Sequence, residues 1–310
     1  MKKLSLIVSL PTLENDYQQQ QAKEAERVGA KLGVEVTVID SHNDSITQSL
    51  DLLKIVQSKS DTRQDGIIVE PAGGTAFPQV AKAAVSSGMG WVVLNRNADY
   101  IADLRSATQS PVFCVGPDHD EIGRLQGRQL AALLPQGGSV LYIEGPAASS
   151  SARKRHAASL ETMPANLQLF RMNAHWTEQS AYNVVTRWLR LPTSRETAIQ
   201  AIAAQDDSMA MGARRAIEEG MTGTDRERWL SLPFLGCDGV PETGQAWVRQ
   251  GLLRATVISP ANTAPAIEML VSWLRAGTVQ PPYSLTKPAS YPPAETLTPV
   301  AKAKAQSSLM

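Results

Sequence analysis

The sequence has no excess of either charge. Its 310 residues include thirty Lys and Arg against thirty Asp and Glu, so the formal net charge at pH 7 is zero. A protein that binds the phosphate backbone of DNA or RNA needs a basic surface that replaces the counterions. We therefore expect this chain to make no direct contact with nucleic acid.

Cysteine and histidine are also scarce. The two cysteines, Cys114 and Cys237, each lie in a short apolar run and have no CxxC spacing. We expect them to be small buried side chains, not a disulfide or a reactive thiol. The four histidines are scattered and form no HxxxH pair or Cys/His group of the kind that holds zinc. The sequence thus predicts no metal site and no cofactor.

Long hydrophobic runs are absent. No run approaches the roughly 18 apolar residues that a membrane-spanning helix needs. The chain has the basic start of a secretory signal, but its first apolar run, residues 4–10, carries Ser5 and Ser9 and stops at Pro11. We interpret this run as a first strand, so the sequence does not decide whether the protein is exported.

Common enzyme motifs are missing as well. No GxGxxG follows the first strand, and no GxxxxGK[ST] occurs. The glycines Gly73 and Gly74 after the third strand lack the lysine of a phosphate-binding loop, and Ser150 is not part of a GxSxG turn. An enzyme on a Rossmann-like fold remains only a remote alternative, and we expect no catalytic residues.

What the sequence does contain is a regular alternation of apolar strand-like runs and helical stretches. This pattern indicates parallel sheets with helices on both faces, and 310 residues suffice for two such domains. We predict an α/β fold of two doubly wound lobes. The expected strands are residues 4–9, 34–39, 66–70, 91–94 and 112–115 in one lobe and 139–144, 167–172, 198–204, 233–236 and 254–258 in the other. The expected helices are residues 16–32, 45–57, 76–87, 121–134, 152–163, 178–189, 208–219, 241–249 and 265–276.

Ligands of open parallel sheets bind beyond the carboxyl ends of the strands, so the residues near these ends are the candidates for a site. They are polar, charged or aromatic. Carboxylates accept hydrogen bonds from vicinal hydroxyls, guanidinium groups donate two at once, and aromatic rings stack on apolar C–H faces, which together suits a polyol. The candidate ligand-binding residues are Ser9, Asn15, Tyr17, Asn95, Arg96, Ser150, Arg153, Trp176, Asp206, Asp238 and Ser259.

Four motifs occur in an order that resembles the ribose-binding-protein family, the type I periplasmic sugar-binding proteins related to the effector domains of lactose-repressor-like regulators. They are Asn95-Arg96, residues 151–153 (SAR), residues 205–213 (QDDSMAMGA) and residues 236–239 (GCDG). The resemblance covers residues 4–286. It implies two lobes joined by three crossings, near Pro117, Pro260 and Lys287. Residues 1–117 and 261–286 would form the N-terminal lobe and residues 118–260 the C-terminal lobe. Residues 287–310 would form the last crossing and a Pro/Ala/Lys-rich tail, which we expect to be partly disordered.

The same resemblance implies roles for individual residues. Arg96 and Arg153 would bind the ligand from opposite lobes, Asp238 would accept from hydroxyls, and Tyr17 and Trp176 would sandwich a sugar. Four positions depart from the family pattern: Asn95 for an acid, Asp206 for an amide, Ser259 for Gln and Gln18 for an aromatic residue. The pentose itself is therefore not implied, and a hexose, cyclitol, nucleoside or furanosyl ligand stays open.

Structural interpretations of these residues also stay open. Both arginines could form surface ion pairs, Trp176 and Tyr17 could be packing residues, and Asp238 could serve only its turn. Of the two acids before residue 208, we expect Asp207 to cap the helix and Asp206 to face the ligand.

We expect a substrate-binding protein that closes around a small polar ligand, most simply a sugar, and delivers it to an ABC-type transporter or receptor. The partners would be the ligand and a membrane permease or receptor. The alternative is a cytoplasmic sensor or effector domain, because only three residues precede the first strand and leave no room for a DNA-binding segment. The resemblance implies the periplasm, whereas a native start at Met1 would imply the cytoplasm.

Overall fold

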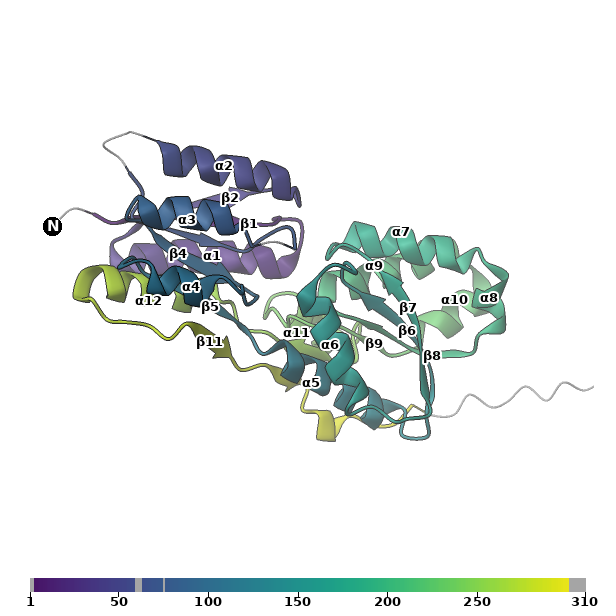
Figure 1. Ribbon diagram of the computed structural model, residues 1–310. Coiled ribbons are helices and arrows are strands. Elements are labelled where there is room, and N and C mark those ends of the chain that lie inside the picture. Colours follow the sequence, from purple (N-terminus) through teal and green to yellow (C-terminus); the bar gives the residue numbers. More distant parts are fainter. Residues whose placement is uncertain (1–2, 59–62, 75, 301–310) are drawn as a thin grey trace, which may run out of the picture.

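Short apolar runs form the strands of two parallel sheets in the computed structural model, which describes residues 3–58, 63–74 and 76–300. Helices cover both faces of each sheet, so the strands are apolar at successive positions and not only at alternate ones. All ten strands expected from the sequence are present, with ends shifted by at most two residues. The predicted fold class is confirmed: two α/β lobes lie side by side (Figure 1).

The first lobe has a six-stranded sheet in the order β11-β5-β4-β3-β1-β2, parallel throughout. The bounds are β1 Ser5–Leu10, β2 Glu35–Asp40, β3 Gly66–Val69, β4 Gly90–Leu94, β5 Val112–Pro117 and β11 Tyr283–Thr286. Leu6 and Val8 of β1 face one side of the sheet and Ile7 faces the other, and each side has its own buried core. All the carboxyl ends of these strands therefore point in one direction, toward the second lobe.

Helices α1 and α12 cover one face of this sheet, and α2, α3 and α4 cover the other. Asn15 caps α1 by accepting a hydrogen bond from the Gln18 N–H, and Gly33 ends it with φ +62°. Ala25 and Val28 are the buried contacts of α1 with the sheet. The bounds are α1 Asp16–Leu32, α2 Ser45–Gln57, α3 Pro78–Ser86, α4 Ile101–Ser106 and α12 Thr263–Ala276.

The second lobe is built in the same way around the sheet β7-β6-β8-β9, which β10 extends through a parallel bridge from Leu235 to Ala255. Helix α5 covers one face, and α7 and α9 cover the other. The strand bounds are β6 Gly138–Glu144, β7 Leu167–Asn173, β8 Ile199–Ala204, β9 Phe234–Leu235 and β10 Thr256–Ile258. The helix bounds are α5 His119–Leu133, α6 Ser150–Leu160, α7 Glu178–Leu189, α8 Pro192–Glu196, α9 Asp207–Gly220, α10 Gly223–Leu230 and α11 Gly244–Arg249.

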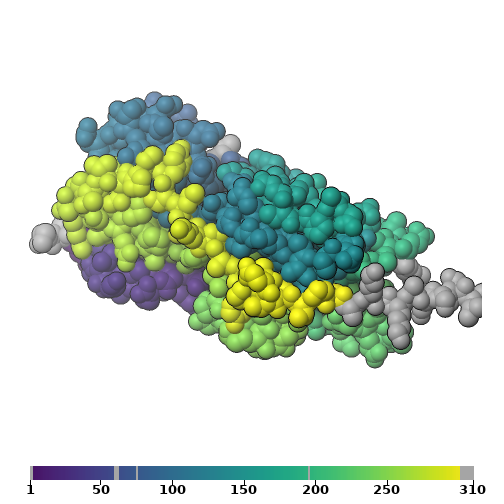
Figure 2. Space-filling view, turned by 90° about the horizontal axis from the view of Figure 1, so that it is seen from below, coloured from purple at the N-terminus to yellow at the C-terminus, as the bar shows by residue number. Residues whose placement is uncertain are grey.

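The chain passes between the lobes three times. The first passage follows β5 at Pro117, and the second follows β10, after which α12 packs beside α1 in the first lobe. The third follows β11, and its continuation β12 (Ala289–Tyr291) pairs antiparallel with β10 of the second lobe. Figure 2 shows this last segment, in yellow, running along the surface from one lobe to the other.

Several elements were not expected from the sequence. They are α4, α8, α10, β11, β12 and a 3-10 turn at Ala294–Thr296, all of them short. The tail from Lys287, expected to be partly disordered, is ordered as far as residue 300, because Leu297 is buried against the second lobe and the Val300 N–H donates to the Leu133 carbonyl. Residues 301–310, the end of the expected tail, lie outside the described residues.

Helices α7 and α9 approach each other so closely at Gly212 that a Cβ there would lie 2.1 Å from the Glu178 carbonyl oxygen. We expect Gly212→Ala to lower the free energy of unfolding by about 1–3 kcal/mol, because backbone must move to make room. Gly220, at the end of the same helix, has its nearest neighbour at 4.0 Å. Gly220→Ala should be neutral or slightly stabilising. Thermal melts of both variants check this, and equal effects would contradict it.

Candidate ligand-binding cleft

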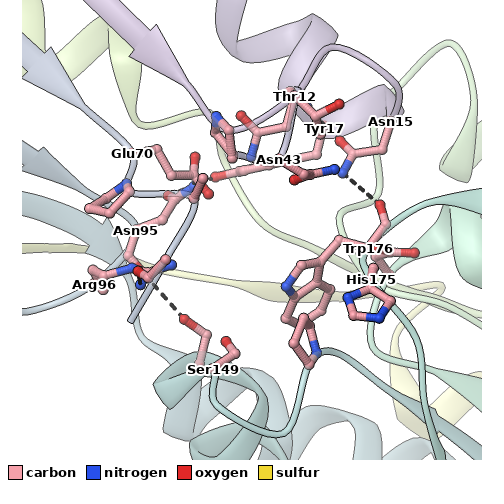
Figure 3. Close-up of a pocket in the computed structure, with 18 of the residues that line it drawn as sticks. Thr12, Asn15, Tyr17, Asn43, Glu70, Asn95, Arg96, Ser149, His175 and Trp176 are labelled. Atoms are coloured by element: carbon pink, nitrogen blue, oxygen red, sulfur yellow. Dashed lines mark hydrogen bonds between the residues drawn. The ribbon is translucent and has the colours of Figure 1, made fainter. Parts of the chain in front are cut away.

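A cavity of about 200 Å³ lies between the two lobes, at the carboxyl ends of both sheets. It is smaller than the roughly 300–1,000 Å³ of sites for drug-sized molecules, so it suits a small ligand. Figure 3 shows side chains from both lobes converging on it. Its lining from the first lobe includes Thr12, Asn15, Tyr17, Gln18, Asn43, Glu70, Asn95 and Arg96, and from the second His119, Ser149, Ser151, Arg155, His175, Trp176, Asp206 and Asp238.

Asn95 is the centre of the first-lobe side. It follows β4 with φ +60°, a backbone conformation that asparagine tolerates better than most residues. Its Nδ2 donates to Glu70 Oε2 at 2.5 Å, while its Oδ1 accepts from the Tyr17 hydroxyl at 3.2 Å and from Asn262 Nδ2 at 2.6 Å. The amide of Asn95 is therefore engaged mainly by the protein itself.

Glu70 and Arg96 complete this side with one acceptor and one donor group. Glu70 directly follows β3 and is buried, which raises the pKa of its carboxyl against the opposing hydrogen bond from Asn95. Arg96 donates through one terminal nitrogen to the Gly73 carbonyl at 2.6 Å. Its Nε is buried and has no hydrogen-bond partner among the described residues. Burial also lowers the pKa of Arg96, opposed by the nearby Glu70.

Arg155 of α6 is the cation of the second lobe, and only 6% of its surface is exposed. Its guanidinium donates to the Gln205 carbonyl and to Cys237 Sγ, the latter at 3.4 Å, and lies 5.6 Å from the centre of the Trp176 ring. Its Nε donates to His119 Nδ1 at 3.3 Å. Four neighbours thus hold this buried charge in one orientation.

His119 is a neutral link between this arginine and the first lobe. Burial and the charge of Arg155 lower the pKa of His119 to about 3. In the neutral ring, Nδ1 accepts from Arg155 and Nε2–H donates to the Asn95 carbonyl at 2.6 Å. His119 therefore couples the positions of Arg155 and Asn95.

Two buried carboxylates, Asp206 and Asp238, face the same cavity from the ends of β8 and β9. Burial raises the pKa of Asp206 to about 7, although the Met209 N–H and Arg155 oppose this. Burial likewise raises the pKa of Asp238, and Arg155 again opposes it. Asp206 Oδ1 caps α9 through the Met209 N–H at 2.5 Å, but its Oδ2 is buried without a partner in the described part of the chain.

The roles of the neighbouring acids Asp206 and Asp207 differ from those expected. Asp206, not Asp207, is the N-cap of α9. Asp207 instead holds the turn around Asp238, because its carboxylate accepts from the Gly239 N–H and from the Thr256 hydroxyl, both at 2.7 Å. The cause is the backbone: the last extended residue before the helix supplies the cap.

The two lobes touch at both rims of the cavity. Asn15 Nδ2 of the first lobe donates to the Trp176 carbonyl of the second at 2.8 Å (Figure 3). The Ser151 hydroxyl donates to the Asn95 carbonyl at 3.4 Å. Trp176 has φ +60°, and its ring packs against Gly145, where a Cβ would come within 2.0 Å of it. These contacts fix the ring at the cavity wall.

Seven of the eleven sequence-predicted residues line the cavity: Asn15, Tyr17, Asn95, Arg96, Trp176, Asp206 and Asp238. Ser9 is buried and bonds to Ser41 and Gln48, and Ser259 is buried as well, but neither lines the cavity. Ser150 lines a separate hollow at the first crossing.

Arg153 is also not in the cavity. It is exposed and donates to the carbonyls of Ala147 and Ala148. The arginine that reaches the cavity is Arg155, two residues further along α6. Residues two apart on a helix point in different directions. The motif was therefore located correctly, but the wrong arginine of α6 was assigned to the ligand.

Several lining residues were missed: Thr12, Gln18, Glu70, His119, Ser149, Ser151, Arg155 and His175. Glu70 could have been found, because it directly follows a strand. His119 could not, because only the first crossing brings it to the cavity.

Comparisons with known proteins agree with this geometry. The family model of the periplasmic binding protein domain matches residues 6–276. The chain belongs to this family. The ribose import binding protein of Bacillus subtilis is 26% identical over 260 residues, which are 83% of this chain and 76% of that protein. The resemblance inferred from the sequence is therefore confirmed.

Solved structures share the fold. A galactofuranose binding protein superposes with a TM-score of 0.79 at 22% identity, covering 93% of this chain and 94% of its own. The Caulobacter myo-inositol binding protein, solved with myo-inositol bound, gives a TM-score of 0.76 at 24% identity and covers 93% and 92%. The family is one of substrate-binding proteins and not of enzymes.

Three general features follow from the described residues alone. None of their helices is both long and apolar enough to cross a membrane. No group of three or more His, Cys, Asp or Glu side chains within residues 3–58, 63–74 and 76–300 is placed to hold a metal ion. Cys114 and Cys237 are free and buried, as their apolar surroundings in the sequence predicted.

The raised pKa of Asp206 makes a prediction for stability. A carboxyl with a higher pKa in the folded state stabilises the fold while it is protonated, so this contribution is lost as the pH rises from about 4 to about 7. We expect Asp206→Asn, which keeps the cap, to remove this loss. The gain in free energy of unfolding of the unliganded variant over wild type should be larger at pH 8 than at pH 5, by on the order of 2 kcal/mol.

Thermal melts of wild type and variant at pH 5 and pH 8 measure this difference. Glu242→Gln, which changes an exposed acid of the same lobe, is the control and should show no such pH dependence. An equal effect of Asp206→Asn at both pH values would contradict the burial of an unpaired carboxylate.

Proposed function

We propose that this protein binds a small polyol, a sugar or a cyclitol, between its two lobes, closes around it and delivers it to an ABC-type transporter. The observation that carries the proposal is the arrangement of charges around one cavity. Arg96 and Glu70 of the first lobe lie opposite Arg155, Asp206 and Asp238 of the second. Each lobe thus presents both hydrogen-bond donors and carboxylate acceptors.

This arrangement matches the chemistry of a polyol. Each hydroxyl can donate to a carboxylate and accept from a guanidinium at the same time, so a ring with several hydroxyls can satisfy both lobes. The unpartnered Arg96 Nε and Asp206 Oδ2 are a donor and an acceptor that a ligand hydroxyl would satisfy. The ring of Trp176 offers an apolar face for C–H groups.

Binding from both sides also explains why a ligand would close the lobes. A polyol held by one lobe would leave half of its hydroxyls unsatisfied, so it binds the closed form more tightly than the open one. This difference in affinity shifts the population toward closure, with the three crossings as hinges. Relatives named for ribose import and neighbours solved with sugars or inositol support this function and its link to import.

The two arginines of α6 provide a matched test. We expect Arg155→Ala to weaken binding of the preferred polyol at least a hundredfold, because each hydrogen bond to a charged group contributes about 1.5–3 kcal/mol and about 1.4 kcal/mol corresponds to a factor of ten. Arg153→Ala, on the exposed side of the same helix, should change the affinity less than threefold. Titration calorimetry measures both, after a thermal-shift screen over pentoses, hexoses, cyclitols and nucleosides. Similar losses in both variants would refute the assigned site.

Closure has its own test. We expect the radius of gyration from small-angle X-ray scattering to fall when saturating polyol is added, and the fluorescence of Trp176 to change, because its ring lies at the cavity wall. Trp176→Phe identifies the part of the signal that comes from this residue. A ligand that binds without changing either observable would favour a site within a single lobe.

A further inference from the structure

On the basis of the proposed function, we propose that Glu70 is the carboxylate with which the first lobe binds ligand hydroxyls, beside Arg96, and that Asn95 holds Glu70 in position. The ligand would thus be a neutral vicinal diol on this side of the cavity. Among the described first-lobe residues that line the cavity, Glu70 is the one carboxylate.

Asn95 itself is poorly placed to accept from a ligand. A carbonyl oxygen has two lone pairs, and both of those on Asn95 Oδ1 are engaged, by the Tyr17 hydroxyl and by Asn262 Nδ2. One Nδ2–H is bound to Glu70. The backbone carbonyl of Asn95 already accepts from His119 and from Ser151. Its contacts therefore orient other groups, Glu70 above all.

Glu70, unlike Asn95, is placed to accept a hydrogen bond from a ligand. It directly follows β3, whose neighbour β4 leads into Asn95, and it lines the cavity. Its Oε2 accepts from Asn95, and the side chain of Gln18 also bonds to the carboxylate. Figure 3 shows the Glu70 carboxylate close to Asn95, with Arg96 further along the same side of the cavity. A carboxylate has about four acceptor positions, so these two bonds leave room for a ligand hydroxyl to donate to Glu70 as well.

The charges support the same assignment. A buried guanidinium is costly unless an anion lies near it. Glu70 is the anion that acts on Arg96, and Arg96 in turn opposes the effect of burial on Glu70. Glu70 and Arg96 thus place one negative and one positive group on the first-lobe side of the cavity.

A carboxylate and a guanidinium that line the same side of a cavity select for a particular ligand group. Adjacent hydroxyls can donate to Glu70 and accept from Arg96, whereas a carboxylate or phosphate on the ligand would be repelled by Glu70. We therefore expect sugar acids and sugar phosphates to bind more weakly than the corresponding neutral sugars.

The first experiment compares Glu70→Gln with Glu35→Gln, which neutralises an exposed glutamate of the same lobe. The probes are D-ribose and myo-inositol, and the one that binds wild type more tightly is used. We expect Glu70→Gln to weaken binding ten- to a hundredfold and Glu35→Gln to change it less than twofold. Binding of Glu70→Gln at wild-type affinity would overturn the assignment while leaving the proposed function intact. Failure of wild type to bind any polyol would instead refute the proposed function.

The second experiment separates contact from a structural effect. Deoxy derivatives of the same probe, each lacking one hydroxyl, are titrated into wild type and into Glu70→Gln. Removal of a hydroxyl that donates to Glu70 should weaken binding to wild type at least tenfold. The same removal should weaken binding to Glu70→Gln less than threefold, because the variant has already lost the interaction. If each deoxy compound loses affinity for both proteins by the same factor, Glu70 does not contact the ligand.

The role of Asn95 as a positioning residue is tested by Asn95→Asp. Two carboxylates at 2.5 Å cannot both ionise, and the other charged groups that act on Glu70 are Arg96 and Arg155, which no variant alters. Between pH 6 and pH 8, the ligand affinity of Asn95→Asp should fall by a factor at least five times larger than the factor for wild type. The double variant Glu70→Gln/Asn95→Asp should lose this extra dependence. A wild-type pH profile for Asn95→Asp would contradict the role assigned to Asn95.

Discussion

The buried charge of Arg155 is the interaction on which the second half of the cleft depends. An arginine that is 6% exposed must have its donors satisfied and its charge balanced, and Gln205, Cys237 and His119 meet the first need. Asp206 and Asp238 meet the second, since Arg155 opposes the rise that burial causes in the pKa of both. Removing Arg155 would leave two buried carboxylates without their cation. The chemistry of the site and the packing of the lobe are therefore one network.

The same network reaches the first lobe and the crossings between the lobes. His119 opens α5 directly after the first crossing and bonds to both Arg155 and the Asn95 carbonyl. Asn262, on the second crossing, bonds to Tyr17 and Asn95, and its Oδ1 accepts from Thr286 just before the third. Each crossing thus has a polar residue within two hydrogen bonds of Asn95. A ligand that shifts the groups around Asn95 acts on the segments that must bend when the lobes move.

Prediction from sequence succeeded where a residue's place along one element decides its role. Apolar runs fixed the ten strands, and the rule that ligands lie beyond strand ends led to Asn95, Arg96, Asp206 and Asp238. The rule also covers Glu70, but the predicted strand, residues 66–70, included it, whereas β3 ends at Val69 and leaves Glu70 beyond the strand end. Arg153 was chosen in place of Arg155 because the motif was visible but the direction of each side chain on α6 was not. Short elements such as α4 and β12 carry too few apolar residues to show a period.

The sequence by itself determined the fold class, the two-lobed plan and the polar character of the strand ends, because these follow from local hydrophobic patterns and from chain order. Only the tertiary structure decided which polar groups meet across the cleft. The link from Asn95 to Glu70 spans 25 residues, and that from Asn15 to Trp176 spans 161. The tertiary structure also decided which carboxylates lose their water, and hence their raised pKa values, since burial depends on both lobes together. Local pattern sets what each residue can do, and the packing of the two lobes determines which residues act together.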